Sequence, residues 1–176
     1  MFFRKSKKNV LRQRAEPLAR AVLDRAVLPW PYQQSWVADT LEARMDWASL
    51  HGAVLVIRLS QDGGGLEDLA EQFSEALFSL YDYSIRETGV GDSSIARKIR
   101  KVGEQYAGLG VALSEAFSGE VPLEATATAL RKNGIGGGQV DAVAAYAVRL
   151  YAHLSELDAE TIEKAGSQLW PEFHVD

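Results

Sequence analysis

The side chains in this sequence best suited to chemistry near neutral pH are three histidines, His51, His153 and His174. None of them has a second potential ligand at the spacing that a metal site on one helix face requires. The chain contains no cysteine, which excludes disulfides, thiol catalysis and cysteine metal sites. No serine is paired recognisably with a histidine and an acid, as in a hydrolase. The sequence therefore predicts no metal site, no cofactor and no enzyme activity.

His51 has the most informative neighbours of the three histidines. Trp47 and Leu55 each lie about one helical turn away from it, which favours a histidine packed in an apolar core and held by hydrogen bonds. The alternative is a small helical enzyme that uses His51 together with Asp39 or Arg44. The residues themselves leave both interpretations open.

The body of the chain carries one basic cluster, although the net charge of the whole chain is −5. Its members are Arg97, Lys98, Arg100 and Lys101. Clustered cations in an acidic chain either pair with nearby acids, such as Glu87 and Glu104, or bind an acidic partner. Because the body as a whole is acidic, nucleic-acid binding by the body is not expected.

Residues 1–14 form a second basic segment, an N-terminal arm without a single acidic residue. Its aromatic and cationic side chains are typical of a segment that lies on an anionic membrane surface: Phe2, Phe3, Arg4, Lys5, Lys7 and Lys8. A solvated, frayed terminus is the alternative. Apolar runs such as Ala53 to Ile57 are far shorter than the about 18 residues that cross a bilayer, so membrane contact would be peripheral.

The elements that position these residues are expected to be helices, because apolar residues recur at spacings of three and four along most of the chain. No stretch alternates apolar and polar residues for long enough to indicate a strand. The sequence predicts an all-α, single compact domain of about six or seven helices over residues 15–176. Residues 30–36 are expected to be irregular, and the expected helices cover about residues 17–27, 40–59, 66–85, 93–116, 122–132, 140–157 and a short segment after Asp158.

Two glycine-rich stretches are expected to be turns between helices. Gly89 and Gly91 separate two helices, because glycine accepts the positive φ that a helix end and a tight turn require. The run of residues 134–138 lacks the preceding strand and following lysine of a phosphate-binding loop, so it also indicates a turn. Just before the first turn, Asp82 and Arg86 are four residues apart and can pair with each other.

Three blocks of residues occur in a fixed order over about residues 36–137. The first contains Val37, Asp39, Thr40, Leu41, Arg44, Leu50, His51 and Arg58. The second contains Asp82, Arg86, Glu87, Gly89, Val90, Gly91, Asp92 and Lys98, and the third contains Ala129, Leu130, Arg131 and Asn133. Together they resemble the motifs of the ubiquinol-cytochrome c chaperone family. One departure is Tyr106-Ala107-Gly108, where that family usually has phenylalanine-tyrosine-glycine.

The resemblance implies a non-enzymatic assembly factor that holds newly made cytochrome b until the ubiquinol-cytochrome c reductase is built. It favours client binding around the glycine turn and the basic helix, through Asp82, Arg86, Asp92, Arg97, Lys98, Arg100 and Lys101. Structural or binding roles are expected for the remaining motif residues: Asp39, Thr40, Arg44, His51, Arg58, Gly89, Gly91 and Asn133.

The partners implied by the resemblance are cytochrome b and, as in mitochondria, a small second chaperone subunit or the ribosome. The expected location is cytoplasmic and peripheral to the inner membrane, or on the matrix side in a mitochondrion. Since the resembled family serves a haem protein, a haem-binding role of His51 is a further alternative, which a haem titration of wild type and His51→Ala would test. A generic helical peptide-binding adaptor is the third class, and it predicts normal reductase levels when the gene is deleted.

Overall fold

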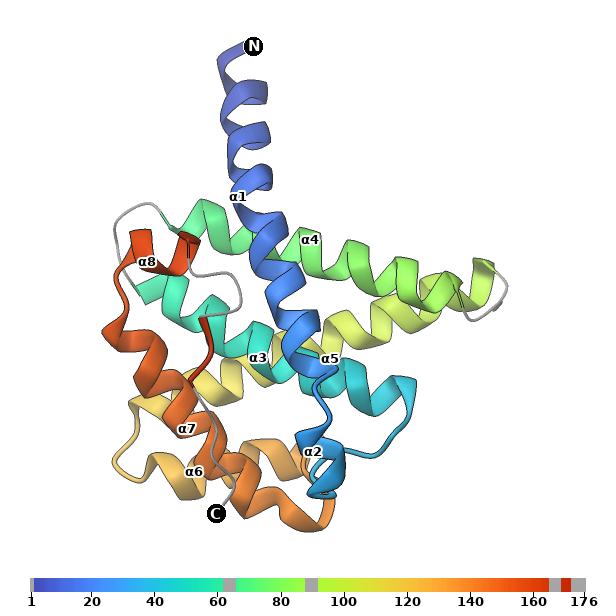
Figure 1. The fold of residues 1–176 in the computed structure, drawn as a ribbon, viewed down its shortest axis with the longest axis vertical. Helices are drawn as coiled ribbons and strands as arrows, with labels where there is room; N and C mark the ends of the chain where they lie inside the picture. The colour runs from blue at the N-terminus through green and yellow to red at the C-terminus, as the bar shows by residue number, and fades with distance from the viewer. Residues whose placement is uncertain (1, 62–65, 88–91, 165–168, 172–176) are drawn as a thin grey trace.

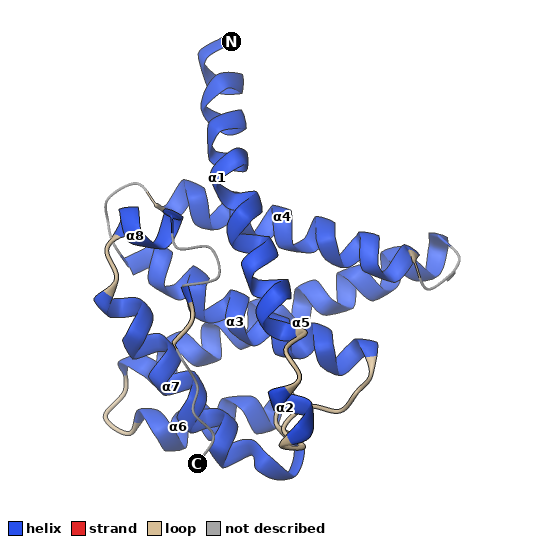
Figure 2. Cartoon of the chain, in the orientation of Figure 1, coloured by secondary structure: helices blue, strands red, loops and turns tan. Residues whose placement is uncertain are grey.

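The computed structural model describes residues 2–61, 66–87, 92–164 and 169–171 of the chain. Every regular element in these ranges is a helix (Figure 2), so the all-α prediction is confirmed. Six of these helices have eleven residues or more. The elements are α1 (Phe2–Ala26), α2 (Trp30–Gln33), α3 (Leu41–Gln61), α4 (Glu67–Arg86), α5 (Asp92–Ser118), α6 (Pro122–Lys132), the 3-10 turn η1 (Gly137–Gln139), α7 (Val140–Glu156) and α8 (Ala159–Lys164).

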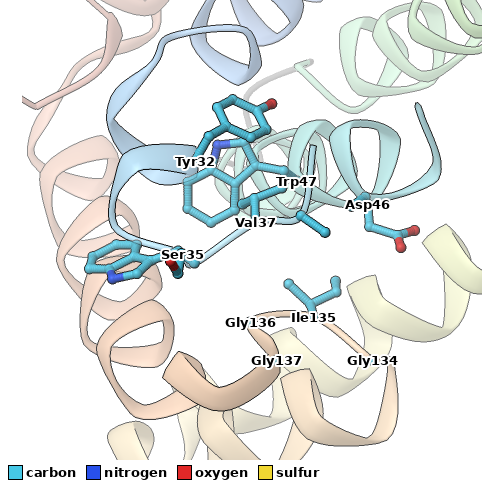
Figure 3. A pocket seen from close by; sticks show the side chains of 12 residues that line it. Tyr32, Ser35, Val37, Asp46, Trp47, Gly134, Ile135, Gly136 and Gly137 are labelled. Carbon is cyan, nitrogen blue, oxygen red and sulfur yellow. The ribbon is translucent and has the colours of Figure 1, made fainter. Parts of the chain in front are cut away.

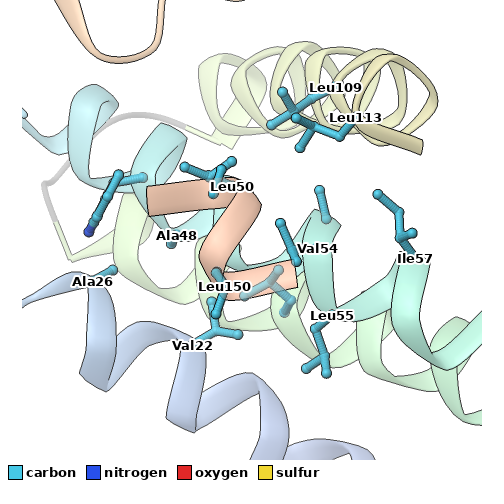
Figure 4. Close-up of a cluster of buried hydrophobic side chains, with 14 of the residues drawn as sticks. Val22, Ala26, Ala48, Leu50, Val54, Leu55, Ile57, Leu109, Leu113 and Leu150 are labelled. Atoms are coloured by element: carbon cyan, nitrogen blue, oxygen red, sulfur yellow. The ribbon is translucent and has the colours of Figure 1, made fainter. Parts of the chain in front are cut away.

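The helix α3 lies at the centre of the fold, in contact with α1, α4, α5 and α7 (Figure 1). Between residues 45 and 59 it buries almost every side chain, as expected of a helix with neighbours on all sides. Figure 4 shows its apolar side chains between Val22 of α1, Leu113 of α5 and Leu150 of α7. Complete burial of a side chain such as Leu55 contributes about 1.5 to 3 kcal/mol to folding.

The helix α1 begins at Phe2, so the prediction that a helix starts at Pro17 was wrong. Pro17 lies inside α1, where it can donate no backbone hydrogen bond. The helix continues through it because both sides are packed: Leu11 and Ala15 before the proline and Ala19 after it are all buried. The boundary suggested after residue 14 therefore falls within a continuous helix. Its N-terminal end projects beyond the body (Figure 1).

The starts of three other helices agree with the sequence prediction. Thr40 Oγ1 accepts a hydrogen bond from the backbone N–H of Ala43 at 3.2 Å, which caps α3. Asp158 Oδ1 accepts one from the N–H of Thr161 at 2.7 Å and caps α8. α6 begins at Pro122, whose fixed φ suits the first turn of a helix. None of the helices in the described ranges is both long and apolar enough to cross a membrane.

The helices α4 and α5 pack side by side and both contact α3 (Figure 1). α5 begins at Asp92, one residue before the predicted start, whereas Gly89 and Gly91 lie outside the described residues. The close contact with α3 depends on Gly52, because a Cβ atom there would lie only 2.8 Å from Leu77 Cδ2 of α4. On α5, the buried side chain of Ile95 anchors the apolar stripe against the core.

The predicted irregular segment before α3 contains a short helix, α2, instead. This helix has only four residues, so periodicity could not reveal it, because a single turn contains no repeat. The segment is held by tertiary contacts: the rings of Trp30 and Trp36 meet edge to face, with centroids 5.3 Å apart. Tyr32 also donates a hydrogen bond from its hydroxyl to the backbone carbonyl of Ala26, at 2.5 Å.

Candidate functional site

His51 lies at the centre of a buried hydrogen-bond network that joins three helices. Its Nδ1 is 2.8 Å from the carbonyl oxygen of Trp47, and its Nε2 is 2.7 Å from the hydroxyl of Tyr146. A carbonyl only accepts hydrogen bonds, so Nδ1 carries the proton and Nε2 accepts the Tyr146 O–H. Arg25 Nε of α1 in turn donates to the same hydroxyl at 3.3 Å. Burial lowers the pKa of His51 to about 3, so the ring is neutral at physiological pH.

Aromatic rings enclose this histidine. The Trp47 and Tyr146 rings stack with centroids 5.3 Å apart, and Trp170 meets the His51 ring edge to face at 5.2 Å. Trp170 Nε1 also donates to the carbonyl oxygen of Ala21 at 3.0 Å, which fixes the C-terminal segment to α1. The prediction of a packed, hydrogen-bonded core histidine is confirmed. A haem iron could reach His51 Nε2 only by displacing the Tyr146 hydroxyl.

Two further motif residues hold helix ends. The buried guanidinium of Arg58 donates to the carbonyl oxygens of Leu154 at 2.9 Å and Leu157 at 2.6 Å. A cation bonded to the last carbonyls of α7 also interacts favourably with the helix dipole. Asn133 Nδ2 donates to the carbonyl oxygen of Ala129 at 2.8 Å and so closes the end of α6. The contacts of both side chains in the structure are therefore structural.

Asp39, Thr40 and Arg44 lie together at the exposed start of α3. Arg44 pairs with the Asp39 carboxylate, and its guanidinium also lies over the Tyr32 ring, 5.5 Å from the centroid. This hydrogen bond and ion pair raise the pKa of Arg44 still further above its ordinary value. The three residues join the segment before α3 to the first turn of the helix.

Asp82 and Arg86 form the predicted pair on α4. Arg86 Nε donates to Asp82 Oδ2 at 2.6 Å, and Nη2 donates to Oδ1 at 3.3 Å. About half of each side chain is exposed, so the charges of the pair are screened by solvent. The neighbouring motif residues Gly89 and Gly91, and the side chain of Asp92, lie outside the described residues.

The cations of the basic cluster are all exposed, as predicted: Arg97, Lys98, Arg100 and Lys101. They nevertheless occupy two different environments. Lys98 and Lys101 line a cleft next to α3, and Lys98 forms an ion pair with Glu42 at 3.5 Å. Arg100 contacts Glu104 at 3.9 Å instead, along α5 itself. The position of a cation on α5 thus decides whether it faces another helix or solvent.

The cleft, called the basic cleft below, lies between α3 and α5 at the end of α4. It encloses about 230 Å³ and has an apolar floor with charged groups at its rim. Such a combination suits a polypeptide segment better than a small substrate, since it offers apolar contact with few directional polar groups. Its lining residues are Leu41, Glu42, Met45, Asp46, Ile85, Lys98, Lys101, Val102 and Gln105.

A second depression, which we call the aromatic pocket, has a volume of about 410 Å³ (Figure 3). Two stretches far apart in sequence form it: the segment from Tyr32 to Trp47, and the glycine turn of residues 134–137. The turn was predicted, and its backbone requires glycine at position 136. There φ is +91°, and a Cβ atom would lie 2.9 Å from the Cα of Val140.

Asp46 joins the two depressions, because its side chain lines both of them. It also lines a small cavity between them, together with Val102 and Ile135. Figure 3 shows the Asp46 side chain at the edge of the aromatic pocket, turned away from the aromatic rings and toward α5. Sequence reasoning missed this residue. The only signal in the sequence is its position one helical turn after Glu42, which puts both acids on one face of α3. In the structure this face is turned toward the basic cluster on α5.

Comparison with known proteins identifies relatives of this fold. The model of a family described as "Ubiquinol-cytochrome C chaperone" matches residues 33–170. A solved structure, described as the Cbp3 homolog from Brucella abortus, has 26% sequence identity and a TM-score of 0.75, over 97% of this chain and 94% of the other. None of the curated proteins compared with the chain matches it significantly. Since the family match spans most of the sequence, this chain belongs to the ubiquinol-cytochrome C chaperone family.

Proposed function

We propose that this chain is a non-enzymatic assembly chaperone that binds newly made cytochrome b and promotes assembly of the ubiquinol-cytochrome c reductase. The observation that carries this proposal is the family match over residues 33–170. The similarity to the Brucella abortus structure, which covers nearly the whole of both chains, supports it. A chaperone acts on a client protein, and cytochrome b is the client that we assign.

The distribution of polar groups favours binding over catalysis. His51 is neutral, buried and hydrogen-bonded at both ring nitrogens, so it is not available to a substrate. The open depressions instead combine apolar side chains with a few charges at their rims. A surface of this kind can hold an apolar client segment and release it later without changing a covalent bond.

We assign the polar loops of the client to the exposed charges of α4 and α5. Arg97, Arg100 and Lys101 are exposed on α5, and the Asp82–Arg86 pair lies on the neighbouring helix. Exposed charges change the rate of encounter and the choice of partner much more than they change folding. Reversing all three α5 cations to glutamate should therefore leave the domain folded while weakening capture of cytochrome b.

The projecting end of α1 is proposed to rest on an anionic membrane surface, close to where a membrane protein is inserted. Its cations begin within the first eight residues, and Lys8 in addition pairs with Glu75 at 3.3 Å. Deleting residues 2–7 tests this contact more cleanly than deleting residues 1–14, because Leu11 is buried and Arg14 pairs with Glu163. The shortened protein should float less with anionic liposomes, and salt should mimic the deletion. Binding that is equal for both proteins would refute the membrane contact.

The decisive test of function is deletion of the gene. It should lower the amount of assembled reductase and shorten the lifetime of newly made cytochrome b, and re-expression should restore both. Normal reductase without this chain would overturn the proposal and favour the generic adaptor.

Cross-linking in cells then tests the client and its surface. Newly made cytochrome b should be cross-linked to wild type and much less to the variant in which Arg97, Arg100 and Lys101 are glutamates. Lys98 and Lys101 line the basic cleft, whereas Arg97 and Arg100 do not. Two double variants therefore serve as a matched pair: one with Lys98 and Lys101 changed to glutamate, and one with Arg97 and Arg100 changed to glutamate. A folded triple variant that captures cytochrome b as well as wild type would show that the basic cluster is an ordinary solvated face.

A further inference from the structure

The aromatic pocket and the basic cleft lie next to each other along one side of α3. The small cavity between them shares Asp46 and Ile135 with the pocket, and Asp46, Val102 and Gln105 with the cleft. The three depressions therefore share lining residues along α3, and we call them together the α3 groove. It runs from the glycine turn past Asp46 to Lys98.

Asp46 is the one acid along this side of α3 that lacks a partner in the described part of the chain. Asp39 pairs with Arg44, and Glu42 pairs with Lys98. Asp46 is half-buried, yet it forms no hydrogen bond or ion pair with another described residue. Burial raises its pKa, the negative charge of Glu42 adds to that rise, and Lys101 offsets part of it.

A partly desolvated carboxylate without a partner is costly for the folded protein, and an incoming cation removes that cost. Asp46 has the basic cleft on one side and the aromatic pocket on the other. The pocket side offers the partly exposed rings of Tyr32 and Trp36 with backbone from the glycine turn, which suits a large apolar side chain. Because the pocket holds about 410 Å³, it can accept such a side chain together with its own backbone.

We propose that one segment of the client binds along the α3 groove, with a large apolar side chain in the aromatic pocket and a neighbouring lysine or arginine on Asp46. Charge complementarity at Asp46 selects this occupant. Lys98 is already paired with Glu42, and Lys101 offsets only part of the effect of burial on Asp46, so this carboxylate gains a charge-assisted hydrogen bond from an incoming cation. The identity of the client as cytochrome b rests on the proposed function. The requirement for adjacent apolar and basic side chains rests on the groove alone.

Photo-cross-linking tests whether one segment spans the groove. A benzoylphenylalanine is placed at Ala38, an exposed residue that lines the aromatic pocket, or at Gln105, an exposed residue that lines the basic cleft. Val121, exposed on the far end of α6 and outside the groove, is the control position. Mass spectrometry of the cross-links should identify the same cytochrome b segment from both groove positions and not from the control.

Exchange of charges tests the role of Asp46. Asp46→Lys should reduce the cross-link from Ala38 about tenfold, and Asp46→Asn should reduce it less, because the neutral amide neither attracts nor repels the client cation. Changing the mapped client lysine or arginine to glutamate should have the same effect as Asp46→Lys. Combining the two reversals should restore the cross-link. Melting temperatures of both Asp46 variants within a few degrees of wild type would exclude misfolding as the cause.

The outcomes separate this inference from the proposed function. If wild type and folded Asp46→Lys capture cytochrome b equally, client binding in the α3 groove is refuted, and the chaperone role stays intact. Cross-links from Ala38 and Gln105 to unrelated segments, or to a different protein, would overturn it as well. Reductase assembly that does not depend on the gene at all would instead overturn the function.

Discussion

Two polar residues on α3, five positions apart, illustrate two uses of a polar side chain. His51 is fully buried and bonded at both nitrogens, and its partners lie on α3 itself and α7. Asp46 is half-buried at the surface and has no partner among the described residues. A satisfied buried polar group stabilises one arrangement of the helices, whereas an unsatisfied one at a depression can be satisfied by a binding partner. Substitutions should therefore affect stability at the first site and binding at the second.

The largest expected effect is that of His51→Ala. The substitution leaves a cavity and removes the acceptor of the Tyr146 hydroxyl and the donor to Trp47, so it should lower the free energy of unfolding by about 3 to 5 kcal/mol. Chemical denaturation followed by circular dichroism measures this difference.

Asp46→Ala on the same helix is the matched control. Because it removes no hydrogen bond or ion pair with a described residue, it should change the free energy of unfolding by only about 0.5 kcal/mol. Equal losses for the two alanine variants would contradict the distinction between a structural and a binding residue.

The second effect is a dependence of stability on pH. The unfolded chain has a His51 pKa near 6.5, while burial lowers it to about 3 in the folded protein. Between these values the unfolded state binds the proton and the folded state does not, so stability should fall as pH falls below 6.5. The loss should be about 1 to 1.5 kcal/mol for each pH unit.

The comparison with His51→Gln isolates this contribution from that of the acids. Glutamine cannot be protonated but keeps a donor and an acceptor, so the variant should lose stability less steeply between about pH 6 and 4. Identical slopes for the two proteins would show that His51 is not responsible.

The third effect concerns the wall of the α3 groove. Gly136→Ala forces a Cβ onto a backbone with φ of +91° and within 2.9 Å of the Val140 Cα, which should cost about 1 to 3 kcal/mol. Gly138→Ala is the control, because no atom outside its chain neighbours lies within 4 Å of its Cβ and its φ is ordinary. Thermal unfolding of both variants checks this, and equal melting temperatures would mean that the turn is not rigid.

The features that the sequence predicted depend on neighbours along the chain. Apolar periodicity located the long helices, and the predicted starts of α3 and of the short α8 coincide with the cap residues Thr40 and Asp158. The chemistry of His51 was also readable, because Trp47 lies one turn away. The exception was α1. Its first half carries mostly polar and charged side chains, so its helix depends on tertiary contacts of Leu11 and Ala15 that no local pattern shows.

The α3 groove could not be predicted because it is built from residues distant in the chain. The aromatic segment before α3 and the glycine turn after α6 each indicated a break in structure, and nothing in either sequence shows that they face each other. Asp46 was missed for the same reason, because its spacing from Glu42 is the only sign of it in the sequence. A lone acid on a helix is ordinary until the fold places it between two depressions.

The smallest expected effect is the coupling between Asp82 and Arg86. The pair has good geometry, with Nε to Oδ2 at 2.6 Å, but about half of each side chain is exposed to solvent. A double-mutant cycle of the alanine variants should therefore give a coupling energy of only about 0.3 to 0.5 kcal/mol, which salt should reduce further. A coupling above about 1 kcal/mol would mean that the exposed charges of α4 also stabilise the fold. Stabilisation by polar groups would then not be confined to buried residues such as His51. A small coupling leaves the pair free to contact a client, because breaking it would cost the folded domain almost nothing.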